Sequence, residues 1–309
     1  MKRTSALRSW KRALGKYWQL YLLLVPVIAY YVIFKYVPML GAQIAFRNFK
    51  FSKGIWGSQW VGLKHFTRFF STYNSLTIIS NTFILSFLQL IFCFPIPIIL
   101  ALIFNEIRSA RFKKSMQTIT YAPHFISTIV VVGMLMSLCS PSTGVINKLL
   151  VTLGLTDEPL YLMGRAEYFR MMYIISGIWK DSGWNAIIFI SALSAIDVSL
   201  YEAAKVDGAS RWQQLIKITL PCILPTIIIM LILECGRVLN IGFEKVYAMQ
   251  TDLNLSVSEV ISTHTYKLGL EKLQYDYATA IGLFNSLVSF IMLITVNWIS
   301  KRVTETSLW

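Results

Sequence analysis

Charged residues are scarce in this chain. They make up 14% of its 309 residues, whereas soluble domains carry about 25%. The hydrophobic fraction is 55% and the mean hydropathy is +0.58. This shortage of charge excludes an ordinary soluble domain and predicts a membrane protein.

Residue types that carry metal and redox chemistry are also few. The chain has four cysteines and three histidines, and no cysteine pair has C-x-x-C spacing. We interpret the cysteines as apolar packing residues: Cys93, Cys139, Cys222 and Cys235. No set of His, Asp and Glu gathers at one membrane face, so we predict no metal site and consider a membrane-embedded enzyme a poor interpretation.

A phosphate-binding loop of the form G-x-x-x-x-G-K-S/T is missing as well. The nearest pattern, Gly15-Lys16, lacks the earlier glycine and is followed by Tyr17. The chain is therefore not expected to bind ATP in that manner, and we predict no cofactor on it.

Long apolar runs are what the sequence does have. Six segments reach the ~20 residues that cross a bilayer: 17–37, 77–104, 115–138, 169–193, 218–240 and 277–300. The first run lacks a small-x-small cleavage site after it, so we expect it to stay as an anchor. These runs predict an all-α membrane protein with six transmembrane helices in one domain, residues 17–300.

The net charge of +14 is distributed as in a membrane protein. Bases cluster in a segment before the first span (1–16), between the second and third spans, and in the tail (301–309). The positive-inside rule then places both termini in the cytoplasm. Residues 41–75 are basic and aromatic, yet this topology places them on the outer side of the membrane, against the rule. We expect them to form a helix or turn at the outer membrane interface. This placement makes a nucleic-acid partner a poor interpretation.

A polar island separates the fourth and fifth spans, with the sequence EAAKVDGASRWQQLIKITLP from Glu202. Ser199 lies three residues before Glu202, which predicts a capping box. Gly208 then permits a sharp turn, and a second helix starts near Ser210. We expect two short helices that form a compact protrusion over residues 199–221; the alternative is an ordinary amphipathic loop held by local ion pairs.

The spacing of Glu202-Ala203-Ala204, Asp207-Gly208 and Leu220-Pro221 resembles the cytoplasmic coupling loop of ATP-binding-cassette (ABC) importer permeases. The sequence of residues 206–212 is similar to the corresponding segment in the carbohydrate-uptake branch of that family. Three further pieces resemble permeases of oligosaccharide importers, including aldouronate importers, in Gram-positive bacteria: Tyr36–Met39, Trp60–Lys64 and Tyr121–Ser127.

This resemblance implies a type I ABC importer permease fold in the plasma membrane of a bacterium, with no enzymatic activity of its own. It implies a second homologous permease, two ATPase subunits that bind ATP and Mg, and an extracytoplasmic sugar-binding lipoprotein. It also implies ATPase-coupling residues in the loop: Glu202, Ala203, Ala204, Asp207 and Gly208.

Polar side chains within the spans are candidates for the substrate path, because ionisable groups there usually face a cavity or a partner. The fourth span has polar residues between two indole rings, with Gly183 as a possible break: Trp179, Lys180, Asp181, Trp184 and Asn185. The alternative is a local Lys180–Asp181 pair. The fifth span has a stripe at i, i+3 spacing that lines a cavity or contacts the second permease: Glu234, Arg237 and Asn240. His124 is interpreted as a packing or capping residue at a bend, and Gln89 has no predicted role.

We predict a permease subunit that carries an oligosaccharide by alternating access. One alternative is a permease for another solute, such as a peptide. The other is an ion-coupled secondary transporter, which would show inverted repeats and usually more spans.

Overall fold

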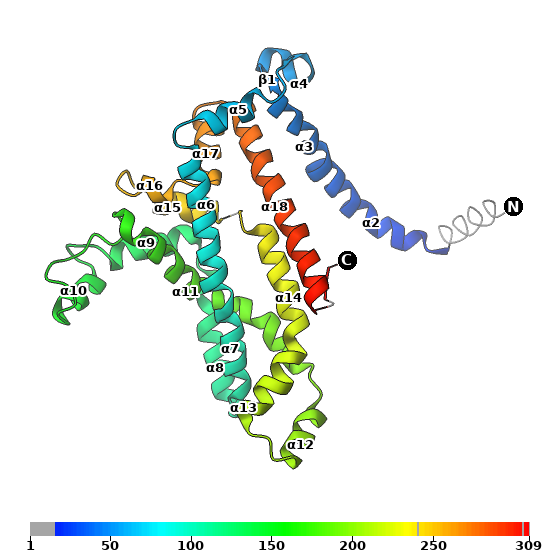
Figure 1. Ribbon diagram of the computed structural model, residues 1–309, viewed down its shortest axis with the longest axis vertical. Helices are drawn as coiled ribbons and strands as arrows, with labels where there is room; N and C mark the ends of the chain where they lie inside the picture. Colours follow the sequence, from blue (N-terminus) through cyan, green and yellow to red (C-terminus); the bar gives the residue numbers. More distant parts are fainter. Residues whose placement is uncertain (1–15, 240, 305, 309) are drawn as a thin grey trace.

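The computed structural model describes residues 16–239, 241–304 and 306–308. Figure 1 shows an elongated assembly of helices with one short hairpin at one end and helices α12 and α13 at the other. Four helical runs are long and apolar enough to cross a membrane, and two bent helix pairs bring the number to six. The prediction of a helical membrane protein is confirmed, and the predicted six spans correspond to the count in which each bent pair is one span.

The first half of the chain contains the hairpin and the first three spans. Its elements are α2 (Trp18–Tyr31), η1 (Val32–Tyr36), α3 (Val37–Met39), η2 (Leu40–Phe46), β1 (Arg47–Asn48), η3 (Phe51–Lys53), α4 (Gly54–Gly57), β2 (Gln59–Trp60), α5 (Lys64–Ser71), α6 (Ser75–Leu88), η4 (Gln89–Cys93), α7 (Pro95–Glu106), α8 (Ala110–Tyr121), η5 (Ala122–Phe125), α9 (Thr128–Leu138) and α10 (Val145–Thr152).

The second half contains the remaining spans and two groups of short helices. Its elements are α11 (Ala166–Ser194), α12 (Val198–Val206), α13 (Arg211–Gln214), η6 (Leu215–Thr219), α14 (Leu220–Arg237), α15 (Phe243–Met249), α16 (Leu255–Ser258), α17 (Ile261–Tyr266), η7 (Lys267–Glu271) and α18 (Tyr275–Thr304). We refer to residues 243–274 as the α15–α17 lobe.

Proline explains where three spans change their helical pitch. The π-helical turns η1, η4 and η6 each end two residues before a proline, namely Pro38, Pro95 and Pro221. Proline has no N–H to donate and its ring crowds the preceding turn, and a wider π turn absorbs that local defect without ending the helix. The second and fifth spans therefore remain continuous over 32 and 27 residues.

The third span differs from the prediction of one helix over 115–138. Helices α8 and α9 meet at a 98° bend. Pro123 lies in the 3₁₀ turn η5 at this bend, and Ser127 caps α9 by accepting a hydrogen bond from the N–H of Val130 (3.3 Å). A new N-cap after a proline ends one helix and starts another.

Gly183 does not break the fourth span, contrary to the expectation from sequence. Helix α11 continues for 29 residues through it. A Cβ added at Gly183 would lie 2.1 Å from the carbonyl oxygen of Thr120 in α8. The glycine is needed for the close approach of two helices, and its own helix is intact.

The first span lies apart from the other helices. No residue of α2 is buried, and Figure 1 shows this helix leaning away from the rest of the chain. An apolar helix with every face open requires lipid or another protein around it.

The basic 41–75 segment folds as a hairpin and short helices at the end opposite α12 and α13 (Figure 1). Arg47 donates to the carbonyl oxygens of Trp56 (3.2 Å) and Ser58 (2.9 Å). The guanidinium carbon of Arg68 lies 4.2 Å from the ring centroid of Tyr277. Arg47 and Arg68 of this segment therefore have partners within the chain.

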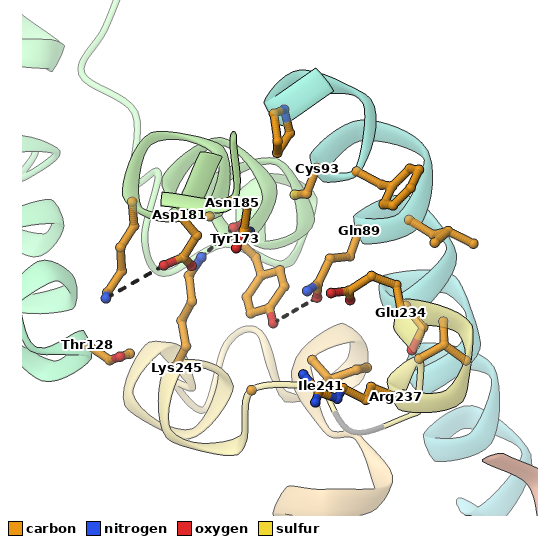
Figure 2. A pocket seen from close by; sticks show the side chains of 18 of the residues that line it. Gln89, Cys93, Thr128, Tyr173, Asp181, Asn185, Glu234, Arg237, Ile241 and Lys245 are labelled. Atoms are coloured by element: carbon orange, nitrogen blue, oxygen red, sulfur yellow. Dashed lines mark hydrogen bonds and ion pairs between the residues drawn. The ribbon is translucent and has the colours of Figure 1, made fainter. Parts of the chain in front are cut away.

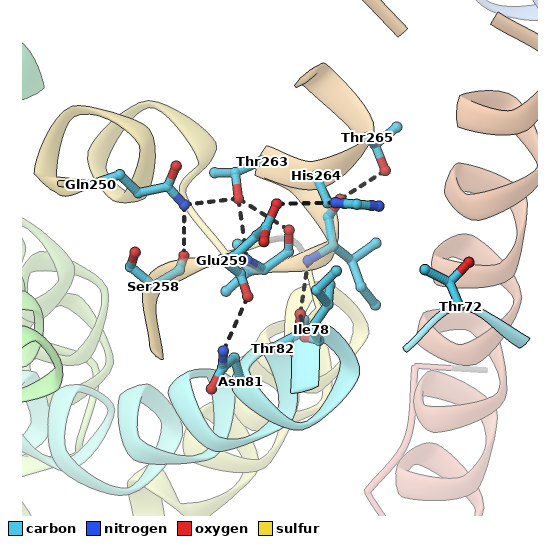
Figure 3. A network of polar contacts seen from close by, with 12 residues as sticks. Thr72, Ile78, Asn81, Thr82, Gln250, Ser258, Glu259, Thr263, His264 and Thr265 are labelled. Carbon is cyan, nitrogen blue, oxygen red and sulfur yellow. Dashed lines mark hydrogen bonds and ion pairs between the residues drawn. The ribbon is translucent and has the colours of Figure 1, made fainter. Parts of the chain in front are cut away.

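Hydrogen bonds fasten the α15–α17 lobe to α6, as Figure 3 shows. Asn81 donates to the carbonyl oxygen of Ser256 (2.9 Å), and the N–H of Ile261 donates to the hydroxyl of Thr82 (2.9 Å). Buried polar groups paired in this way fix one arrangement of their segments. These bonds therefore join the second span to the lobe.

Candidate functional site

A cavity of about 490 Å³ lies between the second, fourth and fifth spans. Helices α6, α7, α11 and α14 form its walls, together with the α8–α9 junction and the start of α15 (Figure 2). Its polar lining comprises Ser86, Gln89, His124, Thr128, Tyr173, Lys180, Asp181, Asn185, Glu234, Arg237, Glu244 and Lys245. A cavity of this size that offers many hydrogen-bonding groups suits a polar ligand.

One face of α11 supplies the largest share of this lining. Tyr173, Gly177, Asp181, Asn185 and Phe189 follow one another at i, i+4 spacing and all line the cavity. Residues four apart lie on the same face of an α-helix. An unbroken α11 therefore aligns these side chains, which a helix interrupted at Gly183 would not do.

Asp181 has two charged or polar neighbours, His124 at the α8–α9 bend and Lys180 on its own helix α11. Its Oδ1 lies 2.9 Å from Nδ1 of His124 and 3.9 Å from Nζ of Lys180. The ring of His124 stacks on that of Trp184, with centroids 4.7 Å apart. Lys180 also donates to the carbonyl oxygen of His124 (3.0 Å). His124 thus lies at a bend and packs, as expected, but it also lines the cavity and contacts Asp181.

Lys245 crosses from the α15–α17 lobe to α11. Its Nζ donates to the carbonyl oxygen of Tyr173 (2.7 Å) and lies 4.4 Å from that residue's ring centroid. A Cβ at Gly177 would come within 3.2 Å of Nζ, so glycine leaves the space that this ammonium occupies. The hydroxyl of Tyr173 in turn donates to Gln89 (3.4 Å), as Figure 2 shows.

The structure brings most of the predicted path residues together. Lys180, Asp181, Asn185, Glu234 and Arg237 line the cavity, whereas the two tryptophans do not. On α11, Trp179 is two residues from both Gly177 and Asp181 and so projects from the opposite face. The ring of Trp184 reaches the site indirectly, through its stacking on His124.

Two residues of the predicted stripe on the fifth span, Glu234 and Arg237, line the cavity. Helix α14 ends at Arg237, and Asn240 is outside the described residues. No ion pair joins Glu234 to Arg237 where the structure describes them. The side chains of Glu234 and Arg237 both line the cavity, and neither has an ion-pair partner among the described residues.

Several lining residues had no functional role in the sequence prediction, among them Gln89, Tyr173 and Lys245. Gln89 stood out as a polar residue within an apolar run, and Lys245 as a base just beyond the predicted span. Tyr173 carried no signal, since an aromatic residue is common in any span. Their juxtaposition depends on tertiary packing between three helices.

The loop between the fourth and fifth spans forms two short helices, α12 and α13, as predicted. The predicted capping box at Ser199 is wrong, because α12 begins at Val198. Asp197 is its N-cap and accepts a hydrogen bond from the N–H of Ser199 (2.9 Å). This bond lowers the pKa of Asp197. A capping box is present one helix later, where Ser210 and Gln213 bond reciprocally.

Gly208 makes the turn between these two helices. Its φ is +76°, in the left-handed region that favours glycine. Its N–H donates to the carbonyl of Lys205 (3.1 Å) and the N–H of Ala209 to that of Ala204 (2.9 Å). This pair of bonds is a Schellman motif, a common end of an α-helix. It gives the loop a defined and compact shape.

The loop exposes both charged and apolar side chains at its end of the molecule. Glu202, Ala203 and Asp207 are exposed, and Ala204 is half-buried. Val206 is 88% and Trp212 69% exposed, although both lie next to a turn that is otherwise polar. A rigid protrusion with uncovered apolar side chains is typical of a protein-docking surface.

The described residues contain no group of three or more His, Cys, Asp or Glu arranged to hold a metal ion. The fold and the cavity define a multispan membrane protein of the permease class. By the match of its residues 70–305, the chain belongs to the family of binding-protein-dependent transport system inner membrane components.

Curated relatives from Bacillus subtilis (strain 168) match nearly the whole chain. Protein LplB is 43% identical, over 97% of this chain and 94% of its own. The polygalacturonan/rhamnogalacturonan transport system permease protein YteP is 42% identical, over 94% of this chain and 90% of its own. Such coverage extends the family assignment to the first span.

Solved structures share the fold at similar identity. A chain of a bacterial ABC transporter involved in import of the acidic polysaccharide alginate has a TM-score of 0.88 and 42% identity, covering 96% of this chain and 99% of its own. A chain of a bacterial alginate ABC transporter, in complex with a periplasmic protein that holds an alginate pentasaccharide, has a TM-score of 0.89 and 41% identity, covering 97% of this chain and all of its own. The type I ABC importer permease fold is therefore confirmed.

Proposed function

We propose that this chain is one of two permease subunits of an ATP-driven importer that carries an oligosaccharide into the cell. The observation that carries this proposal is a single structural unit: a rigid exposed loop joined by one continuous helix to a polar cavity. The relatives named for polygalacturonan and alginate support a carbohydrate as the solute. A peptide permease and an ion-coupled carrier are not favoured by these relatives.

The mechanical link runs through the fifth span. Helical structure is continuous from Arg211 in the loop to Arg237 at the cavity, 27 residues in all. At 1.5 Å per residue this is a rod of about 40 Å. A push on the loop would reach Glu234 and Arg237 without passing through a flexible joint. This geometry supports alternating access driven from the loop.

A separate ATPase supplies the energy in this proposal, with ATP and Mg bound on its own subunits. Glu202 and Asp207 offer exposed carboxylates to basic residues of that ATPase, while Val206 and Trp212 supply apolar contact. The small side chain of Ala203, between Glu202 and Asp207, keeps the loop narrow enough to enter a groove on the ATPase. The chain itself performs no covalent chemistry.

The solute that best fits the cavity is an oligosaccharide that contains uronic acid. Arg237 is an exposed lining residue with no ion pair among the described residues, and guanidinium groups bind carboxylates in bidentate fashion. Two relatives carry the names of acidic polysaccharides or their fragments. Several moderate contacts, rather than one tight one, allow the solute to leave.

The remaining partners follow from surfaces that the chain leaves open. A second, homologous permease and lipid would cover α2, which has no buried residue. An extracytoplasmic sugar-binding lipoprotein would dock at the end opposite the coupling loop. The Bacillus relatives support the plasma membrane of a Gram-positive bacterium as the location.

Affinity purification of the tagged chain from its native membrane, followed by mass spectrometry, tests this assembly. The proposal predicts recovery of a second permease and an ATPase. Glu202→Ala should reduce ATPase recovery, whereas Glu158→Ala, an exposed carboxylate outside the coupling loop, should leave it unchanged. Recovery of the chain alone in several mild detergents would favour a self-sufficient carrier.

A further inference from the structure

Three aromatic rings lie together beside the cavity: Phe243 belongs to its lining, and Tyr247 and Tyr266 contact Phe243. We propose that Phe243, Tyr247 and Tyr266 form a stacking platform that binds one sugar ring of the incoming oligosaccharide at the cavity mouth. This proposal rests on the proposed function, because the ligand is the transported solute.

The three rings pack against one another as one cluster. The centroids of Phe243 and Tyr266 are 4.8 Å apart, those of Phe243 and Tyr247 are 5.4 Å apart, and those of Tyr247 and Tyr266 are 5.2 Å apart. Helix α15 presents Phe243 and Tyr247 at i, i+4 spacing, which places them on one face. Tyr266, at the end of α17, completes the group.

The platform is continuous with the cavity. Phe243 itself lines the cavity, beside Glu244 and Lys245. Tyr247 lies one helical turn further out and is 38% exposed. A ligand that contacts Tyr247 would therefore meet Phe243 next and then the polar groups of the lining. The surface leads from solvent into the site.

Exposure distinguishes these rings from aromatic residues that only fill the core. Phe169, a core residue outside the cavity lining, is only 1% exposed. The platform rings are half-buried or exposed. An uncovered aromatic cluster in a membrane protein is covered by lipid, a ligand or a partner protein.

The polar edge of the platform indicates a sugar. The hydroxyl of Tyr247 donates to Oε1 of the exposed Glu271 (3.0 Å), so a phenol and a carboxylate border the rings. Pyranose rings have C–H faces that pack on aromatic rings and hydroxyls at their edges that bond to such groups. An aromatic face with a polar tip matches both halves of this ligand.

A photoreactive benzophenone side chain in place of Tyr247 tests which molecule occupies the platform. The assembly would contain the chain, its partner permease, the ATPase and the binding protein, with a radiolabelled oligosaccharide. We expect label on this chain after illumination, and none when the group replaces Tyr73, which is 98% exposed outside the α15–α17 lobe. Crosslinks to the binding protein or the second permease alone would overturn the proposal, since the platform would then be a protein-docking surface.

Uptake at saturating loaded binding protein gives a second test that does not need the probe. Tyr247→Ala should lower the maximal rate about two- to tenfold, as expected for one lost aromatic contact. Tyr247→Phe should retain most of the rate because it keeps the ring, and Tyr73→Ala should have no effect. Copurification of the ATPase confirms that each variant assembles.

The outcomes separate the two proposals. If the wild-type assembly imports oligosaccharide and Tyr247→Ala equals wild type, the platform is refuted and the importer stands. If the wild-type assembly imports no oligosaccharide at all, the proposed function fails and the platform fails with it.

Discussion

Replacement of Gly183 by alanine is predicted to separate two packed helices. The added Cβ would lie 2.1 Å from the carbonyl oxygen of Thr120 and 2.5 Å from its carbonyl carbon. Both atoms belong to backbone, which has no rotamer to change. Because ordinary contacts begin at 3.4 Å, α8 and α11 must move apart by about 1 Å.

The cost of this movement follows from two opposing terms. Overpacking of a close contact destabilises by about 1–3 kcal/mol, while alanine in place of glycine within a helix gains about 0.5–1 kcal/mol. The net loss is therefore up to about 2.5 kcal/mol. The shift would also carry His124, in the turn η5 that follows α8, away from Asp181; Nδ1 of His124 and Oδ1 of Asp181 now lie 2.9 Å apart.

Thermal unfolding of the purified assembly measures this effect. Gly282→Ala is the matched control, because Gly282 lies within the long helix α18 and an added Cβ meets no atom within 4 Å. We expect Gly183→Ala to lower the unfolding midpoint by several degrees and Gly282→Ala to leave it unchanged or slightly raised. Equal midpoints for the two variants would refute the packing role of Gly183.

Three further predictions concern the coupling loop, the cavity and the α15–α17 lobe. Gly208→Ala should weaken ATPase binding, because alanine at a φ of +76° costs about 1–2 kcal/mol; Gly208→Asn should be milder, and copurification yields would rank the two. Lys245→Met should slow uptake while the ATPase still copurifies, because the ammonium bond to the carbonyl of Tyr173 (2.7 Å) is lost; unchanged uptake would contradict a role in the site. The hydrogen bond to His264 (3.0 Å) lowers the pKa of Glu259 below its ordinary value of 4.5. The ionised Glu259 therefore stabilises the lobe fully above pH 4.5, its ordinary pKa, and this stabilisation is lost as the pH falls through the lowered pKa. Proteolysis of the lobe should accelerate on acidification in the wild type, and this pH dependence should be weaker in Glu259→Gln.

The spans were predictable because a bilayer imposes a length and an apolar composition on each helix. Five of the six runs correspond to continuous helices, and only the third was misjudged. Hydropathy does not register the 98° bend at Pro123 and Ser127, since the residues on both sides of the bend are equally compatible with the membrane. The bend could have been predicted from Pro123 and from Ser127 as a new N-cap, but not from the apolar composition of the run.

The coupling loop was predictable in outline because local rules determine it. Gly208 and Ser210 specify a turn and a helix start from their immediate neighbours. The N-cap of α12 was misplaced by two residues because Asp197 and Ser199 are both good caps, and which one is used depends on where α11 ends. Choices between adjacent capping residues are settled by the path of the whole chain.

The cavity was only partly predictable because it is assembled from distant segments. Polar residues in spans identified Asp181, Asn185 and Arg237, but the contact of Lys245 with α11 depends on how the α15–α17 lobe folds back. The role of Gly183 was misjudged for the same reason. A glycine within a helix has two opposite uses, flexibility and close approach, and only the neighbouring helix decides between them.

Uptake by proteoliposomes that contain the purified assembly tests the central claim most directly. The account predicts accumulation of a labelled uronate-containing oligosaccharide inside the vesicles, dependent on both ATP and the loaded binding protein, and lost in Glu202→Ala. Uptake that proceeds without ATP, and follows an ion gradient in its place, would contradict an ATP-driven importer.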